Sequence, residues 1–138
     1  MTNARGKMWS FKNVLALGLF LFGTTFMWMT AFFAGRTQTP TGLAWSLVNV
    51  LAITAVVGYA VAAWGVFKRY SWWEIAALIS AALGIAAVIP FIIGIRQIEV
   101  EFADFGVQVN LWMHILGSVF VIAISRLPVV HDWVSHRL

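Results

Sequence analysis

A few polar side chains interrupt the long apolar stretches of this chain, and His114 stands out among them. Asn110 lies four residues before it and Ser118 four residues after it, so all three fall on one face of a helix. Asn49, in an earlier apolar stretch, is expected at a similar depth and completes a predicted polar cluster. Polar groups at such positions are costly to bury in lipid. We therefore expect this stripe to face another helix.

Histidine in an apolar setting has several chemical uses. It can ligate haem or chlorophyll, hydrogen-bond a quinone oxygen, or accept a proton on a translocation path. The alternative is that Asn49, Asn110, His114 and Ser118 only hydrogen-bond one helix to the next, at about 0.6 kcal/mol or more per contact. All of these readings stay open, and no cofactor is predicted. His131 and His136 are five residues apart, which separates them on a helix, so no metal site is predicted either.

The composition places these residues in a membrane protein. Of 138 residues, 62% are hydrophobic and only 10% are charged, far below the roughly 25% charged of soluble domains. Backbone groups in hydrocarbon must be paired within their own segment, so the apolar runs are expected to be helices. The chain is therefore predicted to be an all-α, four-helix membrane bundle that forms a single domain over residues 1–138. The predicted spans are 13–34, 42–66, 73–95 and 106–124, followed by an interfacial tail at 128–138.

The distribution of basic residues predicts the orientation of the bundle. With four spans, both termini lie on the same side as the central loop, and that side carries seven of the nine basic residues. The positive-inside rule then places both termini in the cytoplasm, with the protein in the inner (plasma) membrane. The seven residues are Arg5, Lys7, Lys12, Lys68, Arg69, Arg126 and Arg137; the other two are Arg36 and Arg96.

The two halves of the chain have a common layout. At an offset of 61 residues, Ser10 aligns with Ser71, Gly23 with Gly84, and Asn49 with Asn110. Two spans per half give the halves the same orientation, so they are predicted to be two like-oriented helical hairpins.

The layout resembles the SPW-repeat family of small bacterial membrane proteins. The likeness lies in Trp73 followed by Ala76–Gly84 and Pro90, and in the returning spans around Trp45 and Trp112. Ile89-Pro90-Phe91 stands where the family has its Ser-Pro-Trp signature. The resemblance implies two helical hairpins in a membrane and specifies no activity.

A stripe of small residues marks the third span. Ala76, Ser80 and Gly84 recur at every fourth position, which lets helix backbones approach closely. The stripe is expected to lie at the centre of helix packing or at an oligomer contact.

No phosphate-binding loop, nucleophile–base pair or pair of intramembrane carboxylates is present, so the protein is not expected to be an enzyme. The leading hypothesis is a structural or accessory subunit acting through helix–helix association, as a homo-oligomer or in a larger complex. The alternatives are a small oligomeric transporter or channel, and a cofactor-contacting subunit of an electron-transfer or light-harvesting complex that uses His114. The lipid bilayer is an expected partner and nucleic acid is not, because the basic residues form no patch.

Overall fold

The computed structural model describes residues 10–33 and 41–138, and all regular elements in these ranges are helices. The first membrane-length helix is built from α2, a one-turn 3-10 segment η1, and α3. The other three are α4, α5 and α6, and a short helix α7 follows. Their bounds are α2 Phe11–Thr24, η1 Thr25–Met27, α3 Trp28–Ala31, α4 Gly42–Lys68, α5 Trp73–Gln97, α6 Phe105–Arg126 and α7 Pro128–Ser135.

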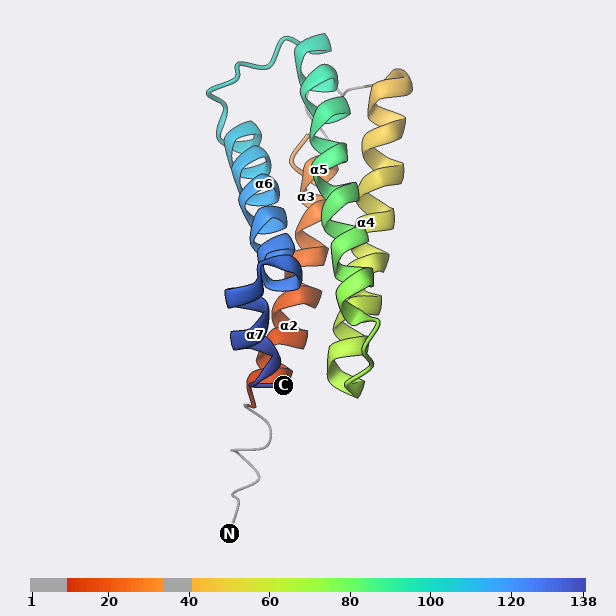
Figure 1. Ribbon diagram of the computed structural model, residues 1–138. Coiled ribbons are helices and arrows are strands. Elements are labelled where there is room, and N and C mark those ends of the chain that lie inside the picture. Colours follow the sequence, from red (N-terminus) through yellow and green to blue (C-terminus); the bar gives the residue numbers. More distant parts are fainter. Residues whose placement is uncertain (1–9, 34–40) are drawn as a thin grey trace.

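The predicted all-α fold with four membrane-length helices is confirmed. The four helices have 21, 27, 25 and 22 residues and are apolar enough to cross a bilayer. They run alternately up and down the bundle, so α2–α4 and α5–α6 form two antiparallel pairs (Figure 1). Helix α4 packs against α2 and α5, and α5 packs against α6. The described bounds extend one to two residues beyond those predicted for the second, third and fourth spans. Ala34, the predicted end of the first span, lies outside the described residues.

The helix ends are defined by local backbone chemistry. Ser10 caps α2 by accepting a hydrogen bond from the Asn13 amide, and Asp104 caps α6 by accepting from Gly106 and Val107. Such caps satisfy amides that have no partner inside the helix. Arg69 ends α4 in the left-handed conformation, with φ of 60°. The turn between α4 and α5 is therefore tight, and the two helices pack along their length.

Small residues allow the helices to approach closely in the interior. A side chain at Gly58 in α4 would occupy the position of Ser80 Oγ in α5. A Cβ at Gly23 in α2 would lie 2.5 Å from Cβ of Tyr59 in α4. In a bilayer, where lipid is as apolar as the helices, this close contact is a main source of association between helices.

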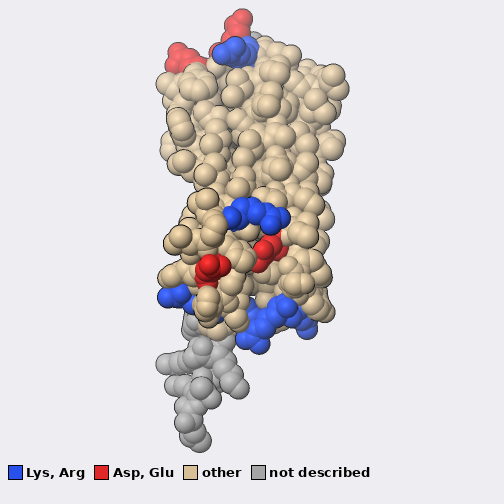
Figure 2. All heavy atoms as spheres, in the orientation of Figure 1, with Lys and Arg blue, Asp and Glu red and all other residues tan. Residues whose placement is uncertain are grey.

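Charged residues gather at the two ends of the bundle and leave the middle apolar (Figure 2). The end formed by the start of α2 and by α7, here called the basic end, has more cations than acids among the described residues. The opposite, acidic end carries three acids and Arg96. The basic end holds Lys12, Lys68, Arg69, Arg126 and Arg137 with Glu74 and Asp132; the acidic end holds Glu99, Glu101 and Asp104. Arg5, Lys7 and Arg36, which enter the predicted orientation, lie outside the described residues.

Candidate functional site

The predicted polar stripe of α6 faces the interior of the bundle. Asn110, His114 and Ser118 are all completely buried, and Tyr59 from α4 is buried beside them. These four side chains are called the buried polar cluster below. Aromatic rings of the first membrane-length helix pack against Tyr59 and His114. The four-residue spacing on α6 thus placed its three members correctly on one buried face.

His114 has a contact at each ring nitrogen. Its Nδ1 lies 2.6 Å from the Asn110 carbonyl oxygen, and its Nε2 lies 3.3 Å from Thr25 Oγ1. A carbonyl can only accept, so Nδ1 carries the proton in the neutral ring. The Thr25 hydroxyl also lies 2.6 Å from the Phe22 carbonyl, so it can donate either to that oxygen or to Nε2.

The hydrogen-bond partners of the Thr25 hydroxyl therefore depend on the charge of His114. With a neutral ring, its single hydrogen can be donated to Nε2 or to the Phe22 carbonyl. With a protonated ring, Nε2 donates to Thr25, which then donates to Phe22. The Phe26 ring lies 4.3 Å from the imidazole centroid and covers it. Because Thr25 and Phe26 occupy the space around His114, the arrangement disfavours direct ligation of a haem or chlorophyll metal.

Three oxygen atoms of the cluster have no hydrogen-bond partner among the residues that the structure describes. They are Tyr59 Oη, Asn110 Oδ1 and Ser118 Oγ. The hydroxyls of Tyr59 and Ser118 lie near each other but do not have the geometry of a hydrogen bond. Most buried polar atoms in proteins are paired, directly or through ordered water. These three atoms therefore keep hydrogen-bonding capacity that no described side chain uses.

Asn49 does not belong to this cluster. It lies half-buried on α4, and no hydrogen bond joins it to Asn110 or His114 in the described structure. Helices α4 and α6 both pack against α5 and lie at opposite corners of the bundle. The short side chain of asparagine does not cross that distance, whereas the longer Tyr59 extends toward Ser118. No pattern in the sequence singled out Tyr59 or Thr25, because tyrosine and threonine are common in apolar spans.

The small-residue stripe of α5 is used inside the chain. Ser80 and Gly84 are buried, and Ala76 is half-buried. Ser80 packs against Gly58 and donates a hydrogen bond to the Ala76 carbonyl. A Cβ at Gly84 would lie 2.5 Å from Phe26 Cζ and 3.2 Å from Ser118 Oγ. The stripe was expected either at the centre of helix packing or at an oligomer contact. The structure shows it at the centre of helix packing within the chain.

A polar contact that the sequence did not indicate joins α7 to α5. His131 Nε2 lies 2.8 Å from Glu74 Oε1, and His131 Nδ1 lies 3.5 Å from Asp132 Oδ1. Hydrogen bonding and charge attraction from Glu74 raise the pKa of His131 above 6.5. Glu74 lies in the first turn of α5. In the part of the chain that the structure describes, no three potential metal ligands gather.

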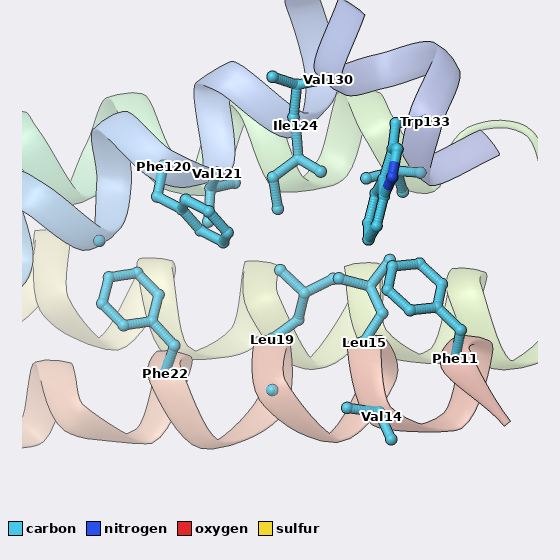
Figure 3. Close-up of a pocket in the computed structure, with 13 residues that line it drawn as sticks. Phe11, Val14, Leu15, Leu19, Phe22, Phe120, Val121, Ile124, Val130 and Trp133 are labelled. Atoms are coloured by element: carbon cyan, nitrogen blue, oxygen red, sulfur yellow. The ribbon is translucent and has the colours of Figure 1, made fainter. Parts of the chain in front are cut away.

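Two hollows lie along α2 on the outside of the bundle. The first, here called the α2/α6 slot, separates α2 from α6 beneath α7 and has a volume of about 650 Å³ (Figure 3). The second, the α2/α4 groove, is shallower and has a volume of about 530 Å³. The slot is lined by Phe11, Val14, Leu15, Gly18, Leu19, Phe22, Gly117, Phe120, Val121, Ile124, Val130, Trp133 and Val134. The groove is lined by Asn13, Ala16, Leu17, Phe20, Ala60, Ala63, Trp64 and Phe67.

Comparisons of the chain with protein-family models, curated proteins and solved structures found no match. The resemblance to SPW-repeat proteins stays a prediction. The fold and these sites define the chain as a four-helix, multi-pass membrane protein with a buried polar cluster.

Proposed function

We propose that the protein is a non-catalytic accessory or structural subunit that associates with a transmembrane helix through the α2/α4 groove. The partner is either a second copy of the chain or a subunit of a larger inner-membrane complex. The positive-inside rule supports an orientation with both termini in the cytoplasm. The two antiparallel pairs are consistent with an internal repeat of one hairpin.

The shape of the α2/α4 groove carries this proposal. Its floor holds three alanines, Ala16, Ala60 and Ala63, and its walls include the exposed side chains of Phe20 and Trp64. A floor of small residues lets the backbone of another helix approach closely, which favours association in lipid. The small-residue stripe of α5 cannot serve this purpose, because it is already buried inside the bundle.

Single-cysteine cross-linking tests the groove, since the chain has no cysteine of its own. Cysteine is introduced by Ala60→Cys in the groove and, in a separate protein, by Ala82→Cys on the exposed side of α5. Native membranes are then treated with a bifunctional thiol reagent. We expect one discrete adduct from Ala60→Cys, either of dimer mass or with one constant partner.

The Ala82→Cys protein is the matched control and should yield no discrete adduct. Adding Leu17→Ala, which widens the groove without filling it, should leave the Ala60→Cys adduct in place. Equal cross-linking from both cysteines, or none from either, would contradict association through the groove.

The buried polar cluster favours a second candidate function, proton handling in a small transporter. The hydrogen-bond partner of the Thr25 hydroxyl can follow the protonation state of His114, and three unpaired oxygens lie in the same cluster on α4 and α6. Ion or proton flux into liposomes holding the purified protein tests this candidate. Flux that is abolished by His114→Ala and Asn110→Ala would support it, and flux that survives both changes would exclude these residues from the path.

A further inference from the structure

The α2/α6 slot differs from the groove in depth and in lining. All thirteen lining residues are apolar or aromatic, and the surface that they present to the slot is almost entirely apolar (Figure 3). An apolar cavity of this kind stays dry, because water finds no hydrogen-bond partners in it. Left empty, its lining would also forfeit dispersion contacts. Hydrocarbon is therefore the filler that suits it.

The length of the slot matches one leaflet of a bilayer. It follows α2 from Phe11 to Phe22, which is about 16 Å at 1.5 Å per residue. The hydrocarbon core of a membrane is about 30 Å thick, so the slot covers roughly half of it. At its inner end Phe22 lies over Gly117, and a side chain at Gly117 would clash with that ring. The slot thus ends near the middle of the bundle.

The volume of the slot suits a hydrocarbon chain. This volume is about 650 Å³, which lies within the range of small-molecule pockets. A flexible hydrocarbon chain can follow a wall that is made of side chains from α2, α6 and α7.

Polar and cationic groups lie where a lipid head group would be. Phe11 and Trp133 meet edge to face at the basic end of the slot, with ring centroids 5.5 Å apart. The Trp133 indole N–H has no hydrogen-bond partner in the described structure. The guanidinium of Arg137 lies 3.7 Å from the centroid of the same ring.

The basic end presents a net positive charge to the adjoining lipid head groups. Both acids described there, Glu74 and Asp132, lie within ion-pair distance of His131. Across the described ranges, the basic side chains of Arg126 and Arg137 form no ion pair with an acid. Such a surface attracts anionic head groups of the adjoining leaflet.

From these observations we infer that the α2/α6 slot is a binding site for one acyl chain of an anionic phospholipid. The acyl chain enters the slot laterally from the leaflet that adjoins the basic end. The head group is held by the guanidinium of Arg137 and the indole N–H of Trp133. This site is separate from the α2/α4 groove and does not depend on the proposed association.

Photochemical labelling in vesicles tests the site directly. The purified protein is placed in phosphatidylcholine vesicles that contain phosphatidylglycerol with a diazirine on one acyl chain. After illumination, the labelled residues are found by mass spectrometry. We expect labelling concentrated on the slot-lining residues of α2 and α6. Labelling spread evenly around the bundle would overturn the proposal.

A substitution that fills the slot, paired with a control substitution elsewhere, tests the site a second time. Gly18 faces open space, and a Cβ added there would have no atom within 4 Å, so Gly18→Leu can fill the slot without a clash. Slot labelling should be lost in Gly18→Leu and kept in Ala82→Leu, which adds a similar bulk to the exposed side of α5. Undiminished slot labelling in Gly18→Leu would contradict the assignment. The wild-type labelling map needs no variant and decides the question if Gly18→Leu fails to fold.

The head group is tested by replacing the probe with phosphatidylcholine that carries the same diazirine chain. The wild-type slot should be labelled severalfold less by this zwitterionic lipid, and Arg137→Gln should reduce the difference. Equal labelling by both lipids would overturn the anionic preference. Cross-links in the slot to another polypeptide, in place of lipid, would show a protein occupant and overturn the proposal as a whole.

Discussion

The hydroxyl of Ser80 in α5 fills the space that a side chain at Gly58 in α4 would require. These residues lie on the two helices that form the tight central hairpin of the bundle. Their contact explains why one small residue of the α5 stripe is matched by a glycine on its neighbour, and it makes the pair suitable for a double-mutant cycle.

We expect Gly58→Ala to destabilise the bundle by about 1–3 kcal/mol, the usual cost of overpacking a core. Ser80→Ala alone should cost little, because it removes one hydrogen bond to the Ala76 carbonyl. The double variant should recover much of the loss, since alanine at position 80 lacks the clashing oxygen. Unfolding in detergent measures all three, and strictly additive effects would contradict the contact.

Two glycines offer a comparison of a packed and an open position. Gly84→Ala should destabilise by about 1–3 kcal/mol, because its Cβ would lie 2.5 Å from Cζ of the buried Phe26. Gly18→Ala should stabilise by about 0.5–1 kcal/mol, since it meets nothing and favours the helix. Thermal unfolding of the two proteins checks the opposite signs. Equal changes in stability for the two variants would show that Phe26 and its neighbours can shift to admit a side chain at Gly84.

The pair formed by His131 and Glu74 predicts that the docking of α7 depends on pH. Because Glu74 raises the pKa of His131, the protonated ring favours the docked state. The contribution of this ion pair to the docking of α7 is complete below the ordinary histidine pKa of 6.5. It is lost as the pH rises through the higher pKa of His131 in the folded protein. Hydrogen exchange of the α7 amides, corrected for the intrinsic rate, should show weaker protection once the pH exceeds this folded-state pKa.

Glu74→Gln should remove this pH dependence, and His136→Gln should leave it unchanged. His136 serves as the control because it directly follows α7 and its Nδ1 lies 2.6 Å from the Asp132 carbonyl oxygen, with no ion pair to Glu74 in the described ranges. Protection that strengthens as the pH rises through the same range would contradict the assigned role of His131.

Thiol accessibility tests the proposed orientation. Ser71→Cys lies in the exposed turn at the basic end, and Glu101→Cys lies in the exposed loop at the acidic end. In intact cells, an impermeant maleimide should label Glu101→Cys and label Ser71→Cys only after the membrane is permeabilised. The reverse pattern would place both termini outside.

The fold could be predicted from the sequence because long apolar stretches are a local property of the chain. Four uncharged stretches long enough to cross a bilayer leave few other structures open to this chain. The spacing of Asn110, His114 and Ser118 also placed them on a buried face, since helix geometry alone fixes that relation.

The remaining features depend on which helices become neighbours, and the sequence does not specify that. Asn49 was grouped with Asn110 by depth, but α4 and α6 lie at opposite corners, and Tyr59 has the length to extend across. His131 and Glu74 are 57 residues apart, and no periodicity connects them. Gly18 and Gly117 face the same slot only because α2 and α6 diverge there.

Association through the α2/α4 groove is tested by the mass of the protein in native membrane patches, extracted into polymer nanodiscs without detergent. We expect a particle heavier than one 15.3 kDa chain with its lipid, and a return to the single-chain mass when Ala60→Leu fills the groove. A wild-type protein that is already a single chain, with no associated polypeptide, would contradict it.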